Sequence, residues 1–272
     1  MQKTISIALT FLLAFIFACT PSKKQDDTMD ENMEGLESME DLPSEAASEI
    51  TIEPLGESPM YPDAKLTFNM PDEGAVVEAG DVSFDFDVSN YELGVQTADA
   101  EDKMIANSGK GQHIHLILNN KPYSAHYEPD FNKEMKPGHY VALAFLSRSY
   151  HESVKGDNAY ALKQFSVGEE QEQLDLSGEH LFYSRPKGTY SGADTARILF
   201  DFYLINTSIS EDGNKVRLTV NGNEFMITEW KPYIVKGLPL GENTFKIELI
   251  DSEGNQVPGP FNVEERIVTL SK

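Results

Sequence analysis

Histidine is the residue type in this chain that offers the clearest chemistry, because five of its six copies lie close together in the sequence. Imidazole nitrogens are common ligands of zinc and copper, and three of them around an open fourth position are typical of catalytic zinc sites. The clustered histidines are His113, His115, His126, His139 and His151. Whether they bind a metal ion depends on which of them the fold brings together.

A hairpin turn at Asn119-Asn120 would bring three of these histidines together. The Asn221-Gly222 pair favours a two-residue type I′ turn, and Asn119-Asn120, which aligns with it, is expected to form the same turn. Counting outward from that turn pairs His113 with His126. His113 and His115 share one face because side chains alternate along a strand, and directly opposed residues have Cβ atoms about 5 Å apart. The predicted metal ligands, for zinc or copper, are therefore His113, His115 and His126. In local geometry the set resembles the three-imidazole zinc site of animal-type carbonic anhydrases.

The same histidines also permit a purely structural interpretation. The intervening Ile114, Leu116 and Leu118 are expected to point into the core, which leaves the histidines on the opposite, solvent-facing side. Polar residues on such a face often only hydrogen-bond to neighbouring loops, and a register shift of one residue would separate the trio. Under this interpretation the protein requires no cofactor.

A second group of polar side chains lies at the end of the apolar strand that is expected after Pro137-Gly138. Hydroxyl, guanidinium and ammonium groups recognise phosphate and carboxylate groups, so this group is the predicted site for a peptide or an anionic ligand. Arg185 and Lys187 form a second basic spot farther along the chain. The alternative for Arg148 is a structural role, capping loop carbonyls and joining two domains. The predicted ligand-binding residues are Ser147, Arg148, Ser149, His151 and Lys155.

Other features of the sequence argue against most enzymatic and nucleic-acid functions. The sequence contains no nucleophile elbow and no P-loop, and its single cysteine is at position 19. The net charge of −23 makes nucleic acids poor partners. A non-enzymatic binding module is therefore predicted. The alternatives are a metal-dependent hydratase or hydrolase at the histidines, and a structural surface spacer or adhesin.

Alternating apolar residues and regularly spaced turns set the expected fold. Residues 83–88 and 215–220 alternate with period two, as half-buried antiparallel strands do. An internal repeat aligns 66–93 with 181–209, and 113–120 with 215–222. The sequence therefore predicts an all-β fold of two tandem immunoglobulin-like β-sandwich domains, at 59–168 and 178–272.

The N-terminal residues predict a cell-envelope location. The apolar run over residues 5–18 is shorter than the roughly 20 residues of a membrane-spanning helix, and it ends in Ile-Phe-Ala-Cys, which resembles a lipobox. We expect a lipoprotein signal peptide at 1–18, a membrane anchor on Cys19, and a disordered acidic tether over 19–58. The predicted product is an outer-membrane lipoprotein, either periplasmic or surface-exposed.

Three segments carry a resemblance to a known family. These are residues 111–123 (GQHIHLILNNKPY), 138–155 (GHYVALAFLSRSYHESVK) and 182–188 (FYSRPKG). They resemble bacterial envelope lipoproteins commonly labelled phosphopeptide-binding protein, and the resemblance covers nearly everything after the tether. It implies phosphopeptide binding, although the spacing Ser149-Tyr150-His151 departs from the Ser-x-x-His pattern of the forkhead-associated domains that read phosphothreonine.

Overall fold

The computed structural model describes residues 49–272, and their regular secondary structure is almost entirely β-strand. The predicted signal peptide, the predicted anchor at Cys19 and the tether up to residue 48 lie outside the described residues. The helices here are single turns, α1 (Ala100–Lys103) and the 3₁₀ turn η1 (Gly192–Thr195). Across 49–272, no helix has the length and hydrophobicity needed to cross a membrane.

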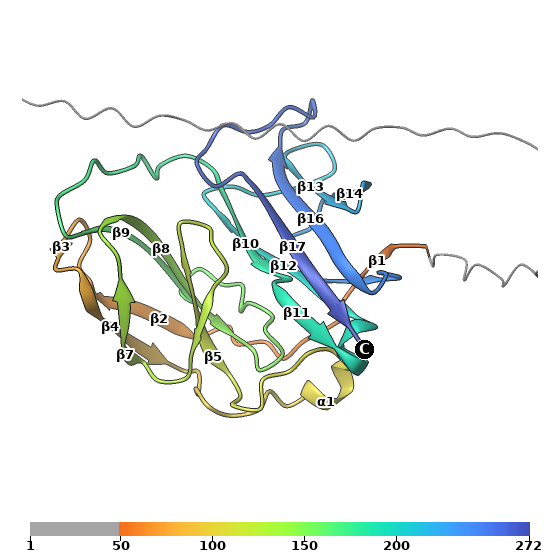
Figure 1. Ribbon diagram of the computed structural model, residues 1–272, viewed down its shortest axis with the longest axis horizontal. Helices are drawn as coiled ribbons and strands as arrows, with labels where there is room; N and C mark the ends of the chain where they lie inside the picture. Colours follow the sequence, from red (N-terminus) through yellow and green to blue (C-terminus); the bar gives the residue numbers. More distant parts are fainter. Residues whose placement is uncertain (1–48) are drawn as a thin grey trace, which may run out of the picture. The chain divides into compact units, whose positions relative to one another are not determined.

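The first sandwich consists of two sheets that are antiparallel except where β3 runs parallel to β9 (Figure 1). Apolar side chains fill the space between them. One sheet has the order β2-β4-β7, and the other has the order β3-β9-β8-β5-β6. The alternation predicted for residues 83–88 is confirmed, since Phe84 and Phe86 on β4 are buried in the core. The strands are β2 (Lys65–Met70), β3 (Val76–Val77), β4 (Gly80–Ser89), β5 (His113–Leu118), β6 (Ser124–His126), β7 (Asp130–Met135), β8 (Gly138–Ser147) and β9 (Tyr160–Val167).

The second sandwich repeats this arrangement with its own core. Its sheets have the orders β1-β15-β12-β10 and β11-β17-β16-β13-β14. Leu218 and Val220 on β13 point into its core, as their alternation predicts. The strands are β1 (Thr51–Pro54), β10 (His180–Arg185), β11 (Gly188–Ser191), β12 (Ile198–Ile205), β13 (Lys215–Val220), β14 (Asn223–Ile227), β15 (Tyr233–Lys236), β16 (Gly241–Ile250) and β17 (Val263–Ser271).

The strand order confirms the internal repeat. The sheet β2-β4-β7 corresponds to β10-β12-β15, and β3-β9-β8-β5-β6 corresponds to β11-β17-β16-β13-β14. In both repeats the first strand pair carries a β-bulge, and a short strand runs parallel to the last strand. The chain therefore folds as two tandem immunoglobulin-like β-sandwiches, as predicted.

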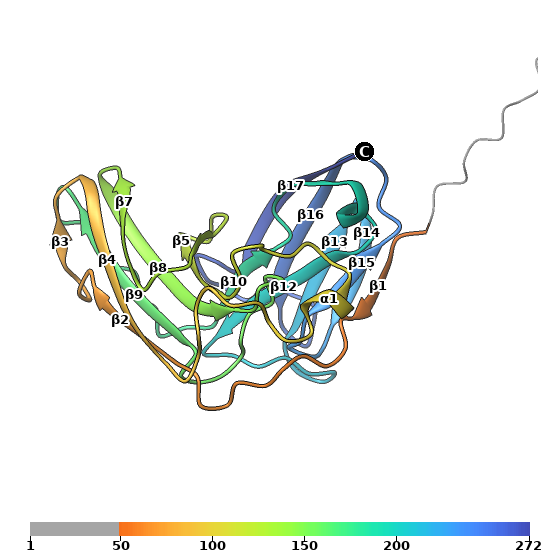
Figure 2. The ribbon, with the colours of Figure 1, turned by 90° about the horizontal axis from the view of Figure 1, so that it is seen from below.

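The end of the predicted tether is instead part of the second sandwich. Thr51 pairs with Lys236 and Pro54 pairs with Tyr233, so β1 forms the edge of that sandwich beside β15 (Figure 2). Ile52 packs against the core of the second sandwich, and burial of this apolar side chain stabilises the ordered strand. The prediction of a disordered tether through residue 58 is therefore wrong from Thr51 onward.

The outer face of the β5–β8 sheet is covered by the second sandwich. Leu143 and Phe145 on β8 pack in one apolar cluster with Phe182 of β10 and Tyr203 of β12. A strand that is buried on both faces reads as a continuous apolar run, and residues 141–146 (VALAFL) are such a run. The side predicted to face solvent is therefore an interior surface, and His113 and His115 lie on it.

Candidate metal centre

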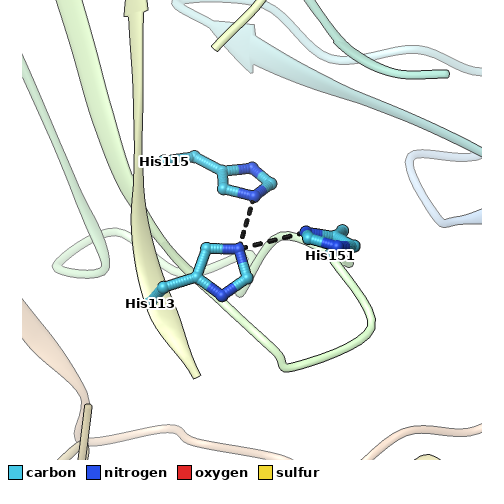
Figure 3. A group of neighbouring side chains, drawn as sticks. All are labelled: His113, His115 and His151. Atoms are coloured by element: carbon cyan, nitrogen blue, oxygen red, sulfur yellow. Dashed lines mark hydrogen bonds between the residues drawn. The ribbon is translucent and has the colours of Figure 1, made fainter. Parts of the chain in front are cut away.

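Strand β5 and the turn after β8 bring three histidines to one point (Figure 3). The Nε2 atoms of His113 and His115 are 2.8 Å apart, and Nδ1 of His151 lies 3.1 Å from Nε2 of His113. The three potential ligand nitrogens all lie within 4.8 Å of one another. Nitrogens around a tetrahedral zinc ion are about 3.3 Å apart, because each lies about 2.0 Å from the metal. The cluster therefore has approximately the spacing of a metal-binding site.

His151 reaches the cluster through a turn that would suit glycine better. Its φ is +70°, and the corresponding turn of the second sandwich has Gly254 at φ +88°. The turns match because the His151 amide donates to Arg148 O as the Gly254 amide donates to Asp251 O. A left-handed conformation costs a residue with a Cβ atom roughly 1–2 kcal/mol. The first repeat therefore keeps a histidine at an unfavourable position, which suggests a role for its side chain.

The predicted third ligand, His126, lies outside this cluster. The predicted register paired His126 with His113, but the structure pairs it with Ile114, so the prediction was wrong by one residue. A shift of one residue turns a side chain to the other face of the sheet. There the His126 ring stacks on Phe131, with ring centroids 3.4 Å apart. His151 occupies the place in the cluster that was predicted for His126.

The same shift brings Tyr123 to the histidines. Its ring stacks on His115 with centroids 3.5 Å apart and an interplanar angle of 16°. Its hydroxyl oxygen is 3.2 Å from Nδ1 of His151. Sequence reasoning missed Tyr123 because the predicted register placed it opposite Leu116, on the core face. Tyr123 therefore both covers and contacts the cluster.

Burial keeps all three imidazoles neutral at neutral pH. His113 and His115 are fully buried, and loss of solvation lowers the pKa of His113 to about 4. Burial also lowers the pKa of His115 and of His151 well below the usual value, with the charge of Arg185 adding to the effect. Neutral imidazole is the form that binds metal ions. The three rings are therefore in the charge state that metal ligation requires.

The hydrogen bonds also orient the ring nitrogens. Nδ1 of His113 is 2.8 Å from Gly111 O, and a carbonyl only accepts, so Nδ1 carries the proton and Nε2 presents a lone pair to the cluster. Burial raises the pKa of Tyr123, so its hydroxyl stays protonated and can donate to Nδ1 of His151. His115 Nδ1 is buried without a hydrogen-bond partner in the part of the chain described. A carbonyl that fixes the tautomer of a histidine is a common companion of metal ligands.

Two cations from the second sandwich lie beside the cluster. Lys187 donates to Tyr123 O at 2.9 Å, and its Nζ lies 4.1 Å from the centre of the Tyr123 ring. Arg185 is buried, lies 5.5 Å from the same ring and donates to the Tyr190 hydroxyl at 2.6 Å. Burial lowers the pKa of Lys187 to about 8, with the charge of Arg185 adding to the effect. The predicted second basic spot is thus adjacent to the histidines.

The predicted anion-binding residues are mostly committed to internal bonds. Arg148 is 4% exposed, and its guanidinium donates to Pro59 O at 2.6 Å and Ser153 O at 3.1 Å. It also pairs with Glu152 at 3.0 Å. The expectation of an exposed donor at Arg148 is therefore wrong, and the side chain caps loop carbonyls, as its structural alternative foresaw.

The remaining members of that set are also occupied. Ser147 and Ser149 are fully buried, and the Ser149 hydroxyl accepts from the Thr97 amide at 3.2 Å. Lys155 forms an ion pair with the fully buried Asp201 of β12 at 2.6 Å. These residues fasten loops and join the sandwiches, so they do not form the exposed surface that was expected. Only His151 from this set belongs to a cluster that could hold a ligand.

Comparisons with known proteins add similarity of fold only. No protein-family model matches the chain, and no curated protein matches its sequence. The fibronectin(III)-like modules of Clostridium thermocellum CbhA align with 76% of this chain and 94% of theirs, at 12% identity and a TM-score of 0.27. The two tandem V-type regions of a v-region-containing chitin-binding protein align over 76% and 100%, at 8% identity and a TM-score of 0.23. Similarity at this level carries no argument about function, and the immunoglobulin-like assignment rests on the sheet topology.

Proposed function

We propose that this protein binds a transition-metal ion, copper or zinc, through His113, His115 and His151. The observation that supports the proposal is the convergence of three buried, neutral imidazoles whose ligand nitrogens lie within 4.8 Å of one another. Imidazole suits copper and zinc, and three such ligands leave a position open on a four-coordinate ion. The Gly111 carbonyl and the stack with Tyr123 hold two of the rings in place.

Metal binding is better supported than recognition of a peptide or an anionic ligand. Phosphate recognition needs hydrogen-bond donors that are free to turn toward the ligand. The Arg148 guanidinium donates to a loop carbonyl, and the Ser149 amide donates to a loop hydroxyl. Lys155 is bound to Asp201. The lone pair on Nε2 of His113 repels an anion and attracts a cation. The family resemblance therefore names a ligand class for which the predicted residues are poorly arranged.

The cellular setting of this function is part of the proposal. A lipid anchor on Cys19 would hold the metal-binding sandwiches in the cell envelope, in the periplasm or at the surface. We propose a non-enzymatic role, in which the protein captures or stores the ion. The burial of His113 and His115 leaves little room for a substrate beside the metal, which favours this role over a hydratase or a hydrolase.

Metal titration of the purified full-length protein tests the proposal. We expect stoichiometric binding of copper or zinc in competition with a chelating dye. His151→Gly removes one ligand and suits the positive φ of the turn, so we expect it to lower the affinity by about 100-fold or more while the protein stays folded. His126→Ala is the control, a histidine of the β5–β6 hairpin that lies outside the cluster.

Two outcomes would contradict the proposal. The first is that neither ion binds the wild-type protein above the level of the His151→Gly variant. The second is that His126→Ala weakens binding as strongly as His151→Gly, which would place the bound ion elsewhere. Circular dichroism on each variant confirms that a change in binding does not reflect unfolding.

A further inference from the structure

We infer that the site selects the monovalent cuprous ion over divalent zinc, and that Lys187 and Arg185 provide this selectivity. The inference rests on the proposed metal site and goes beyond it, because it names the ion and two specificity-determining residues that do not touch it. It depends on where the two cations lie and on what neutralises their charge.

The two cations lie one aromatic ring away from the histidines. His115 covers one face of the Tyr123 ring at 3.5 Å, so the Lys187 ammonium, 4.1 Å from the ring centre, lies over the opposite face. The Arg185 guanidinium is 5.5 Å from that ring and 5.7 Å from the ring of Tyr190. Both charges are therefore too far to bind the ion and close enough to repel it through a ring that excludes water.

Within residues 49–272, no acidic side chain forms an ion pair with Arg185 or Lys187, and the three histidines are neutral ligands. Metal sites that hold divalent ions in proteins often include carboxylates or thiolates, which cancel part of the charge. An ion bound here keeps its full charge beside two positive side chains.

The charge of the ion then decides which metal is held. The Coulomb energy between two charges is proportional to their product, so each fixed cation repels Zn²⁺ twice as strongly as Cu⁺. The cost of moving an ion from water into a buried site rises with the square of its charge, so it is also smaller for Cu⁺. Both effects favour the cuprous ion.

The test compares Lys187→Gln with a matched control. Lys65→Gln makes the same change of charge at an exposed position on β2, in the other sheet of the first sandwich. Affinities of the full-length protein are measured for Cu⁺, under anaerobic conditions with a cuprous chelator as competitor, and for Zn²⁺ with a chelating dye. Lys187→Arg, which keeps the charge, serves as a second variant.

The expected result is a particular ratio between the two affinity gains. Wild-type protein binds Cu⁺ more tightly than Zn²⁺. Lys187→Gln strengthens both, and because doubling an energy squares the corresponding factor, a gain of about 3-fold for Cu⁺ goes with about 9-fold for Zn²⁺. Lys65→Gln changes neither affinity, and Lys187→Arg keeps the wild-type preference.

Three results would overturn the inference. One is tighter wild-type binding of Zn²⁺ than of Cu⁺, which needs no variant and stands even if Lys187→Gln does not fold. Another is an equal gain for both ions in Lys187→Gln, which would mean that the lysine acts through structure and not through charge. The third is that neither ion binds, which refutes the proposed function itself and is thereby distinguished from the other two.

Discussion

His151 shows how one residue can distinguish two otherwise similar turns. The second sandwich has Gly254 at the corresponding place, where the positive φ carries no steric cost. In the first sandwich the steric cost is present, and Nδ1 of His151 lies 3.1 Å from Nε2 of His113. The spacing of His113 and His115 predicted their shared face correctly, because alternation is a local property of a strand. The contact of His151 with His113 depends on the conformation of the turn after β8. The spacing of residues in the sequence does not predict that conformation.

The buried histidines also make stability depend on pH. The pKa of His113 is about 4 in the folded protein and near 6.5 in the unfolded chain, so between these values the unfolded chain binds more protons. The contribution of the neutral His113 ring to stability is therefore fully present above pH 6.5 and is lost as the pH falls toward 4. For the metal-free protein we expect the free energy of unfolding to drop by about 3 kcal/mol through His113 alone.

Urea denaturation at a series of pH values measures this effect. The His113→Gln/His115→Gln variant removes two of the buried imidazoles and is expected to show a shallower decline between pH 6.5 and 4. Equal slopes for the variant and the wild-type protein would show that these histidines do not carry the penalty. Chelator is present throughout, since a bound ion would itself compete with protons.

At the level of elements, the β5–β6 hairpin differs from its counterpart by one residue. The predicted turn is confirmed, since Asn119 and Asn120 both have positive φ, but strand pairing then places Leu116 opposite Ser124. In the second sandwich, the two-residue turn continues into a regular ladder that pairs Leu218 with Phe225. The repeat therefore led to the wrong register, because alignment of sequences cannot show where an extra residue is accommodated. That extra residue places Tyr123 beside the histidines.

Replacing Tyr123 tests the importance of its position beside the histidines. In Tyr123→Ala the hairpin keeps its length, but the ring that stacks on His115 is lost. Loss of a buried aromatic side chain typically costs about 3–5 kcal/mol, and we expect the free energy of unfolding to fall by about 3 kcal/mol or more. Chemical denaturation measures the change. Pro122→Ala keeps the Tyr123 ring and should cost less than about 1 kcal/mol, and equal losses in both proteins would argue against a role for that ring.

At the scale of the whole molecule, the two sandwiches are joined by an apolar cluster and by directed hydrogen bonds. Asn120 donates to Leu181 O at 3.2 Å and to Phe261 O at 2.9 Å, and it accepts from the Tyr183 amide at 2.8 Å. The sequence predicted two domains because each has its own alternating strands. It did not predict their packing, because the apolar run over 141–146 fits a buried strand without naming what covers it.

Asn120→Gly is expected to uncouple the two sandwiches. Glycine tolerates the positive φ, and the corresponding residue of the second sandwich is Gly222, so the turn is kept while the side-chain hydrogen bonds to the other sandwich are lost. We expect the free energy of unfolding to fall by about 2 kcal/mol, since Leu181 O, Phe261 O and the Tyr183 amide lose their partner. We also expect the thermal transition, which is single in the wild-type protein, to broaden or split in calorimetry.

Asn119→Gly provides the control for this prediction. Asn119 also has a positive φ, but its side chain bonds to His139 O and to the Val141 amide, both within the first sandwich. A comparable loss of stability with one sharp transition is expected for this variant. If Asn120→Gly also keeps one sharp transition, the hydrogen bonds of Asn120 do not couple the domains.

The position of β1 has a consequence for the order in which the chain folds. Because Thr51 pairs with Lys236, the second sandwich contains chain segments that lie before and after the first sandwich in the sequence. The first sandwich is therefore inserted into the second. A chain that emerges from its N-terminus completes the first sandwich while β1 still lacks its partner. The second sandwich closes only after β15 has emerged, so its long-range contacts form late. The first sandwich, with the three histidines, is the part that can fold early, and the second then closes over their outer face.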